Sequence, residues 1–416
     1  MPAAARLLAA ACGLIVAALA AQPAAAKPIA GPWVELGPDG TASVREVVAS
    51  GVRACPRVVA DGNTVEARQR GAADGAFPIT VCATQVPANT KHLTVDGKTV
   101  PIVPPTIRRI VVFGDTGCRV LAHFAQDCND PKAWPFPTIA RLAAARHPDL
   151  VIHVGDYYYR EAACPTGSKG CPGTPHGDNW EAWKADFFDP AEPLLAAAPW
   201  VMSRGNHELC RRGGKGWFRL LDRRPMPVAC DNMTAPYRIE TGGLSLLMFD
   251  DADADDFTTE PKKVAAYAAQ LAGLLRRAPP HSWLVTHRPV WALAMGNLPG
   301  VPLNLTGQAA IRGHVPPTLD MVVSGHLHDF ASYQFGPKRP SQLIAGTGGD
   351  TLLPVTPIPL AGETIDGLKV QKGMTLARFG YFVMDRAETG WNGTFYGIDD
   401  GVLARCHIAA RTLDCR

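Results

Sequence analysis

The chain has 416 residues, of which 47% are hydrophobic and 19% are charged. Its 41 Lys and Arg residues nearly balance 38 Asp and Glu residues, a formal net charge of +3, and no strongly basic arm or patch stands out. This charge pattern argues against nucleic acid as an obligate partner, because such binding depends on clustered Lys and Arg. It leaves nucleotides open as substrates.

The first 26 residues are typical of a secretory signal peptide, and the mature chain then starts at Lys27. Arg6 supplies the positive charge, residues 7–21 are apolar, and residues 24–26 are small, as a cleavage site requires. The apolar stretch is shorter than the roughly 20 residues that a membrane helix needs. We therefore expect a secreted or periplasmic protein without a membrane anchor and with a net charge of +2, since Arg6 is the only charge removed.

Removal of the signal peptide also removes Cys12 and leaves ten cysteines out of eleven. An even number suits disulfide bonds in an oxidising compartment. The simplest scheme joins neighbours in the sequence: Cys55 with Cys82, Cys118 with Cys128, Cys164 with Cys171, Cys210 with Cys230, and Cys406 with Cys415.

Residues 27–105 alternate short β-type runs with turns rich in Gly, Pro, Asn and Asp, and they lack a good helix pattern. This pattern predicts a small β-sandwich domain. The proline-rich residues 101–105 form the predicted linker. The expected strands are residues 42–48, 57–59, 78–83 and 92–95.

Residues 106–416 alternate strand and helix patterns, which is typical of an α/β catalytic domain, so two domains are expected in the mature chain. The predicted helices are residues 136–146, 180–197 and 261–277. The predicted strands are residues 107–113, 150–154, 200–203, 244–249, 283–286, 321–323 and 342–345.

Five short blocks with possible metal ligands come directly after predicted strands, where an α/β sheet exposes residues to a ligand. Their donors are carboxylate, amide, imidazole and phenol groups without cysteine, which suits iron, zinc or manganese. One carboxylate can bridge two ions, as two-metal hydrolases require, and Asp156 is the natural bridge. Each block alone would be an ordinary turn or a structural histidine, but five in order indicate a site. The blocks are residues 114–117, 155–159, 205–208, 285–287 and 325–328.

This ordered set resembles the calcineurin-like metallophosphoesterase superfamily and, within it, the purple acid phosphatases. In most of the superfamily the first block reads Asp-x-His, whereas here Gly117 stands two residues after Asp115. Tyr159, three residues after Asp156, replaces the missing imidazole, and this exchange is the purple acid phosphatase pattern. The resemblance implies two packed mixed sheets flanked by helices, the second sheet completed by the β-rich residues 379–409.

The resemblance also implies the ligands of a binuclear metal centre. A tyrosinate with two carboxylates favours Fe(III) in the first position, and a divalent Fe, Zn or Mn ion suits the second. The implied mechanism is in-line attack of a metal-bound hydroxide on a phosphate monoester, and His207, which has no assigned metal, faces the phosphate. The first ion is assigned to Asp115, Asp156, Tyr159 and His328, and the second to Asp156, Asn206, His287 and His326.

One position departs from the family pattern and leaves the leaving-group acid open. Purple acid phosphatases usually have another histidine nine residues after the metal-binding one, where this chain has Gly296. We expect His207 to be the acid, with His176 or His314 as alternatives, because a general acid needs geometry before sequence position. The same departure leaves open a phosphodiesterase or nucleotide-processing enzyme that acts on a small phosphorylated substrate. A non-catalytic binding module ranks last, because all seven ligand positions are filled.

Other residues with possible chemistry receive structural interpretations. His153 lies inside an apolar run and is predicted to be a core histidine or to orient a ligand. The acidic residues 250–256 lack the order of an EF-hand and are expected to form a solvated loop. Tyr157 and Tyr158 are left without a role. The physiological ester, the divalent metal and the oligomeric state stay open, as does the function of residues 27–105.

Overall fold

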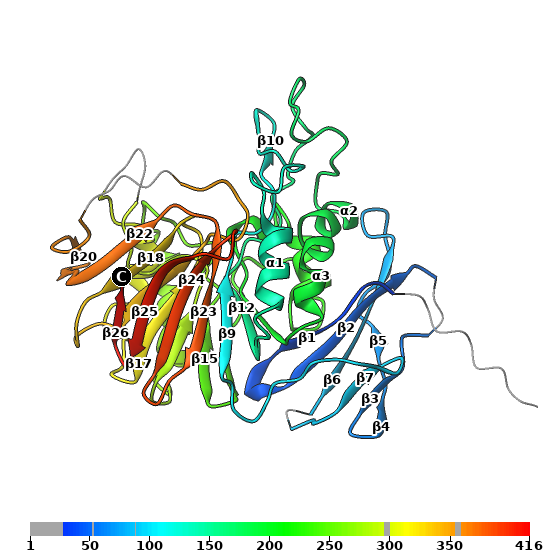
Figure 1. Ribbon diagram of the computed structural model, residues 1–416, viewed down its shortest axis with the longest axis horizontal. Helices are drawn as coiled ribbons and strands as arrows, with labels where there is room; N and C mark the ends of the chain where they lie inside the picture. Colours follow the sequence, from blue (N-terminus) through cyan, green and yellow to red (C-terminus); the bar gives the residue numbers. More distant parts are fainter. Residues whose placement is uncertain (1–27, 52–53, 88, 295–299, 354–358) are drawn as a thin grey trace, which may run out of the picture.

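Two large β-sheets pack face to face in the computed structural model, and helices cover the outer face of each sheet (Figure 1). This confirms the predicted fold class, a double sheet flanked by helices. The structure describes residues 28–51, 54–87, 89–294, 300–353 and 359–416. The predicted signal peptide and Gly296 lie outside these residues.

The first sheet has eleven strands in the order β26-β25-β24-β23-β9-β12-β13-β1-β2-β6-β5. Its centre is parallel, since β12 pairs with both β9 and β13 in that direction. The strands are β1 (Pro28–Leu36), β2 (Ala42–Ala49), β5 (Arg68–Gln69), β6 (Ile79–Val86), β9 (Arg109–Phe113), β12 (Leu150–His153), β13 (Trp200–Met202), β23 (Gly380–Arg386), β24 (Trp391–Gly397), β25 (Val402–Ala409) and β26 (Thr412–Cys415).

The C-terminal strands extend the first sheet, so the expectation that residues 379–409 complete the second sheet was wrong. Strand β23 pairs antiparallel with β9, with Val383 opposite Val111. Both faces of β23 are buried, because Tyr381 faces the helices and Phe382 faces the second sheet. A strand buried on both faces carries no local signal for the sheet edge that it joins.

The second sheet has seven strands in the order β14-β15-β16-β17-β19-β18-β22, with parallel pairing from β15 to β19. Its outer face is covered by α5 (Pro261–Leu275) and α6 (Leu305–Ile311). The strands are β14 (Tyr237–Thr241), β15 (Leu244–Met248), β16 (Ser282–Val285), β17 (Leu319–Ser324), β18 (Phe330–Gln334), β19 (Ser341–Ala345) and β22 (Lys372–Leu376).

Side chains of the central strands alternate between the two faces of the first sheet, so this sheet contributes to two hydrophobic cores. In β9, Val111 and Phe113 point to the helical layer, whereas Ile110 and Val112 point to the second sheet. Successive side chains of a strand face opposite sides, so a continuous apolar run fills both cores. The helical layer consists of α1 (Phe136–Ala144) and a longer stretch made of α2 (Trp180–Trp183), the π-helical η2 (Lys184–Phe188) and α3 (Asp189–Leu195).

The N-terminal segment is rich in strands, as expected, and it joins the first sheet directly. Strand β1 pairs with β13 in parallel, with Glu35 opposite Trp200, and β2, β6 and β5 continue outward from it. The domain boundary near residue 105 stays a prediction, but the pairing shows that one sheet spans it. A separate four-stranded sheet packs on this segment: β3 (Val58–Ala60), β4 (Asn63–Val65), β7 (Leu93–Val95) and β8 (Lys98–Thr99).

Several short elements complete the fold. The hairpin β10 (Val120–Leu121) and β11 (Phe124–Ala125) projects above the first sheet, and β20 (Thr364–Ile365) pairs with β21 (Leu368–Lys369) (Figure 1). The remaining helical turns are η1 (Pro38–Gly40), η3 (Asn206–Glu208), α4 (Gly214–Gly216) and η4 (Trp217–Leu221).

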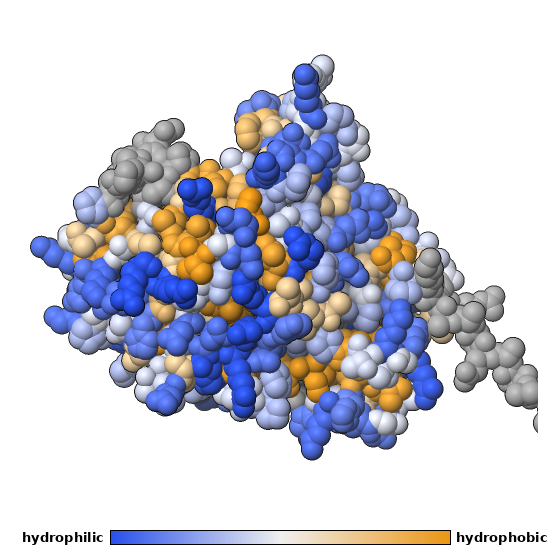
Figure 2. Space-filling model, viewed as in Figure 1, coloured by the Kyte–Doolittle hydropathy of each residue, from blue (hydrophilic) through white to orange (hydrophobic). Residues whose placement is uncertain are grey.

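All five predicted disulfides are formed, so the pairing of sequence neighbours is confirmed. None of the helices in the described ranges is both long enough and apolar enough to cross a membrane. Polar and apolar residues are mixed on the face of the molecule that Figure 2 shows.

A buried arginine joins the N-terminal strands to the segment around η4. Arg45 on β2 is 1% exposed and pairs with Glu35 at 3.0 Å. Its guanidinium also donates to the carbonyl oxygens of Leu220 and Asp222, at 2.8 and 2.6 Å. Burial raises the pKa of Glu35 to about 7, although Arg45 opposes this shift.

We predict that Arg45→Ala lowers the free energy of unfolding by about 3–5 kcal/mol, because it leaves the buried Glu35 carboxyl without its ion-pair partner and removes a donor from the Leu220 carbonyl. Urea denaturation of the purified protein measures this loss. Arg68→Ala is the control, since Arg68 and Glu66 form an exposed pair with 78% and 73% of their side chains accessible. Equal stability of the two variants would contradict the prediction.

Candidate metal centre

The five blocks come together because β9, β12, β13, β16 and β17 end at one edge of the two packed sheets. Backbone hydrogen bonds then join the loops to one another. The amide of Asp115 donates to Gly155 and that of Thr116 to Asp156, both at 2.9 Å, and the amide of Gly325 donates to His287 at 3.0 Å. Between the two sheets, the amide of His326 donates to the Asp115 carboxylate at 3.1 Å, so the loops of both sheets meet.

Three of the predicted ligands have a left-handed backbone conformation, which residues other than glycine rarely adopt. The φ angles are 57° at Asp115, 60° at Asp156 and 68° at His326. Such conformations are uncommon and are concentrated at functional sites, where the surrounding structure maintains them. Close packing adds to this constraint, because a Cβ atom at Gly205 would collide with the Asp156 carboxylate.

The phenol of Tyr159 lies at the centre of one group of predicted ligands. Its oxygen is 2.8 Å from Oδ2 of Asp156, 3.3 Å from Oδ1 of Asp115 and 3.1 Å from Nε2 of His328. Burial raises the pKa of Tyr159 well above its usual value, and the two carboxylates raise it further. A cation at this position would reverse that effect and favour the phenolate.

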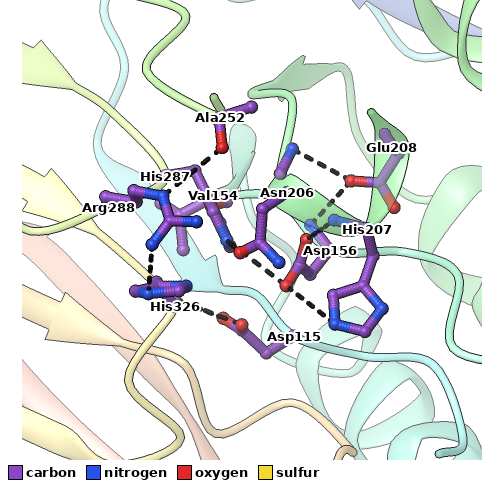
Figure 3. A network of polar contacts seen from close by, with 12 residues as sticks. Asp115, Val154, Asp156, Asn206, His207, Glu208, Ala252, His287, Arg288 and His326 are labelled. Atoms are coloured by element: carbon purple, nitrogen blue, oxygen red, sulfur yellow. Dashed lines mark hydrogen bonds and ion pairs between the residues drawn. The ribbon is translucent and has the colours of Figure 1, made fainter. Parts of the chain in front are cut away.

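A second group forms around His287. Its Nε2 is 3.0 Å from Oδ1 of Asn206 and 3.3 Å from Oδ2 of Asp156, and these side chains point toward one another (Figure 3). One donor atom each from Asp156, His287 and His326 lie within 4.8 Å of one another. Burial alone would lower the pKa of His287, but the Asp156 carboxylate raises it to about 10. The site therefore favours a positive charge beside Asp156.

In each of the three histidines, one ring nitrogen has a hydrogen-bond partner outside the group of predicted ligands, and the other nitrogen is available to bind an ion. The Nδ1 atoms of His287 and His328 lie 2.8 Å from the carbonyl oxygens of Val154 and Thr351. A carbonyl only accepts, so both Nδ1 atoms carry a proton, and each Nε2 atom has a lone pair for an ion whenever its imidazole is neutral. In His326 the two nitrogens have the opposite roles. Its Nε2 contacts Asp256, in the loop after β15, and its Nδ1 is the nitrogen without a hydrogen-bond partner among the described residues.

The donor set fits a metal centre. Contacts connect all seven predicted ligands, and carboxylate, amide, phenol and imidazole donors suit iron, zinc or manganese. The histidine nitrogens without a proton have lone pairs that can bind an ion, and the negative charge of the carboxylates favours a bound cation. Their role as ligands stays a prediction. The connected residues are Asp115, Asp156, Tyr159, Asn206, His287, His326 and His328.

His207 lies beside this centre, as predicted for a substrate-facing residue. Its ring packs on Tyr159 with a centroid separation of 3.7 Å, and its Nε2 is 3.9 Å from Oδ2 of Asp156. Nδ1 lies 2.7 Å from Glu161, which also accepts from Arg212 at 2.6 Å. Burial lowers the pKa of His207, while Asp156 opposes the shift. Its catalytic role stays a prediction.

The alternative acids are placed differently. His176 is exposed in the loop before α2, and its carbonyl accepts from Asn179. His314 follows α6, and its amide donates to Ile311. Within the described part of the chain, neither side chain forms a hydrogen bond with the seven predicted ligands. The position of Gly296 lies outside that part.

The sequence analysis missed Glu208 as a residue of the site. Its buried carboxylate accepts from the backbone amides of Asp156 at 3.0 Å, Tyr157 at 2.8 Å, Tyr158 at 3.2 Å and Gly205 at 2.9 Å. It thus joins the loop after β12 to the loop after β13 (Figure 3). The sequence did contain a signal for Glu208. It is the acidic residue at the end of block 205–208, and in short turns carboxylates often accept hydrogen bonds from backbone amides.

Asp186 was also missed, and no local signal could have found it. It lies in η2, far along the chain, yet its carboxylate accepts from the amides of Cys118 at 3.0 Å and Tyr159 at 2.7 Å. It also pairs with the Arg160 side chain at 2.6 Å. Asp186 therefore ties the first two ligand loops to the helical layer.

The prediction of a solvated loop at residues 250–256 was wrong for its buried carboxylates. Asp251 is 1% exposed and accepts from the amides of His287 at 2.9 Å and Arg288 at 3.1 Å. Asp250 is 8% exposed and accepts from Thr234. Asp251 therefore holds the loop that carries His287, and Asp250 satisfies the amide and the hydroxyl of Thr234.

His153 is buried in the core, as predicted, and its ring stacks on Tyr157 at 3.9 Å. Its Nε2 lies 3.1 Å from Oγ1 of Thr116, directly after Asp115. Tyr157 and Tyr158 are 0% and 1% exposed, so both rings serve packing.

Comparison with known proteins identifies the family. The family model described as calcineurin-like phosphoesterase matches residues 108–330, which include all five blocks. The chain belongs to this family. The predicted superfamily is thus confirmed, and membership implies a hydrolase that acts on phosphoesters of small substrates. No curated protein matches this phosphoesterase.

Solved structures share its fold. A purple acid phosphatase, PPD1 from yellow lupin (Lupinus luteus) seeds, aligns with a TM-score of 0.55 and 14% identity over 89% of this chain and 72% of the lupin chain. GAP50, the anchor in the inner membrane complex of Plasmodium, aligns with a TM-score of 0.46 and 14% identity over 74% of this chain and 90% of its own. The first match supports the fold alone, and the second is too weak to add to it.

We predict that Glu208→Ala speeds amide hydrogen exchange in residues 155–159, because three backbone donors in this segment lose their acceptor. Hydrogen exchange read by mass spectrometry measures this change. Glu240→Ala is the control, since Glu240 pairs with Arg238 on β14 and 48% of its side chain is exposed. Unchanged exchange in Glu208→Ala would show that the loops hold their shape without this carboxylate.

Proposed function

We propose that this phosphoesterase is an exported binuclear-metal phosphatase that hydrolyses phosphate monoesters. The observation that carries the proposal is the position of the Tyr159 oxygen, within 3.3 Å of Asp115, Asp156 and His328. The phenol donates its one proton to Asp156, so the two buried carboxylates beside it still carry negative charge that a bound cation would compensate. Purple acid phosphatases share this feature with the chain: a tyrosine, here Tyr159, replaces the imidazole that is missing at position 117.

The two ions are assigned to the two groups of donors. The phenolate and two carboxylates favour Fe(III) in the first position, and the second suits a divalent Fe, Zn or Mn ion. Bound there, the ions would activate water as the nucleophile and neutralise charge on the phosphate. The first set is Asp115, Asp156, Tyr159 and His328, and the second is Asp156, Asn206, His287 and His326.

His207 is the proposed acid for the leaving group. Its ring is held between Tyr159 and Glu161, and the Glu161 carboxylate accepts from Nδ1 at 2.7 Å. The Nε2 atom is then the nitrogen that can hold a proton toward the substrate. Nη2 of Arg212 lies 2.7 Å from Nδ1 and 2.8 Å from Nε2, and it can only donate, so Nε2 can carry the proton only after this contact is given up.

Export is supported by two features. Five disulfides suit an oxidising compartment. The first 26 residues have the composition of a cleavable signal. We infer a secreted or periplasmic enzyme.

We predict that the purified enzyme is coloured by a tyrosinate-to-iron(III) charge-transfer band, which disappears in Tyr159→Phe. Visible spectroscopy with metal analysis of both proteins tests this. Tyr158→Phe is a matched control, because Tyr158 is a buried neighbour whose hydroxyl donates to the Arg160 carbonyl instead. An active, colourless and iron-free wild-type enzyme would overturn the iron assignment.

We predict that His207→Ala lowers kcat by about 10²–10⁴-fold for alkyl phosphates, the range of general acid catalysis. The loss should be much smaller for nitrophenyl phosphate, because a good leaving group needs no proton. Steady-state kinetics on both esters measures the difference. Equal losses on the two substrates would rule out the acid role while leaving a phosphate-binding role.

The same assays separate the competing functions. Faster turnover of bis-nitrophenyl phosphate than of the monoester would favour a phosphodiesterase or nucleotide-processing enzyme. Full phosphoesterase activity in Asn206→Ala would contradict catalysis at this centre altogether.

A further inference from the structure

His326 differs from the other two histidines in the partner of its second nitrogen. His287 and His328 use backbone carbonyls, whereas Nε2 of His326 lies 3.0 Å from Oδ2 of Asp256. The same carboxylate oxygen is 2.5 Å from Nη1 of Arg288. A side chain from the loop after β15 thus orients a residue in the loop after β17.

The proton between these groups has one favourable position. Nη1 of Arg288 is 2.8 Å from Nε2 of His326, so Nε2 could either accept from Arg288 or donate to Asp256. A carboxylate only accepts, and Arg288 already has acceptors in Asp256 and in the Ala252 carbonyl at 3.3 Å. Donation from Nε2 to Oδ2 of Asp256 gives both His326 and Arg288 an acceptor and leaves the Nδ1 lone pair of His326 for an ion.

Asp256 has a different task from its acidic neighbours. Asp251 accepts from backbone amides of the ligand loop, and Asp255 accepts from the amides of Phe257 and Thr258 at 2.9 and 2.8 Å. In the described ranges, the hydrogen bonds of the Asp256 carboxylate go only to the side chains of His326 and Arg288, and its Oδ1 is buried without a partner. This carboxylate does not stabilise a turn.

The backbone holds Asp256 in place. The amides of Leu305 and Thr306, at the start of α6, donate to the carbonyls of Asp256 and Asp255 at 3.1 and 3.2 Å. The Asp256 carboxylate is therefore fixed relative to the second sheet, and so is the imidazole that it contacts. An anchored carboxylate on the far nitrogen fixes the ring and raises its basicity as a ligand.

We propose that Asp256 is a positioning residue that sets the affinity of the second metal position for its divalent ion by orienting His326. The inference rests on the proposed function, because it assumes that His326 is a ligand. It assigns a role to the acidic stretch that the five blocks leave unexplained. Loss of such a partner typically weakens metal affinity about 10–100-fold.

The test compares Asp256→Ala and Asp256→Asn with the control Asp253→Ala. Asp253 belongs to the same loop but pairs with Lys263 at 2.9 Å, away from the histidines. Competition titration with Zn²⁺ gives the dissociation constant of the second position, and the visible band reports the first. We expect Asp256→Ala to bind Zn²⁺ about 10–100-fold more weakly with an unchanged band. Asp256→Asn should recover much of the affinity through its amide oxygen, and Asp253→Ala should match the wild type.

Two results would overturn the inference alone, provided that the wild type binds two ions. One is the same Zn²⁺ affinity in Asp256→Ala and Asp253→Ala. The other is joint loss of both ions and of the visible band in Asp256→Ala and Asp256→Asn, which would mark Asp256 as a support of the whole site. A wild-type enzyme that binds fewer than two ions would instead overturn the proposed function, and the inference with it.

Discussion

The arrangement of the site depends on two carboxylates, Asp115 and Asp156, that are buried where the two sheets meet. Buried negative charge is unfavourable unless hydrogen bonds or positive charge compensate it. The structure provides both: His326 donates its amide to Asp115, and His207 donates its amide to Asp156. Positive charge comes from His287, because the Asp156 carboxylate raises the pKa of this imidazole to about 10 despite its burial. The positions of the imidazoles and the phenol are those that cations between these carboxylates would require.

A second set of carboxylates holds the backbone of the ligand loops. Glu208, Asp186 and Asp251 accept from amides in the loops after β9, β12, β13 and β16. Each of them belongs to a segment distant from at least one loop that it holds. Such contacts fix loops whose ligands have unfavourable φ angles, so the strain is maintained by the surrounding fold. The geometry of the centre is therefore built into the protein part of the site.

The sequence predicted what is encoded locally. Apolar runs followed by Gly-Asp, Gly-Asn-His and Gly-His-Leu-His identified the strand ends and five of the seven predicted ligands, because strand, turn and donor lie within a few residues of one another. The resemblance to the purple acid phosphatases added Tyr159, and the short block that ends in His287 added the seventh. It failed where the partner is distant. Nothing in β23 indicates pairing with β9, and nothing near Asp186 indicates contact with Tyr159. The acidic stretch was misread for the same reason: composition suggests solvation, and only the fold brings backbone donors to Asp251.

The exchange that distinguishes this chain within its superfamily has a steric basis. A Cβ atom at Gly117 would lie 2.9 Å from Cδ2 of Tyr159, 2.9 Å from Oδ2 of Asp186 and 2.8 Å from the carbonyl oxygen of Tyr157. These separations are shorter than real Cβ contacts, so a side chain at position 117 would displace its neighbours. The Tyr159 ring is one of these neighbours, and the Tyr157 carbonyl and the Asp186 carboxylate are the other two. Restoring a histidine at position 117 would therefore require all three groups to shift, so the glycine suits the close packing of the Tyr159 loop.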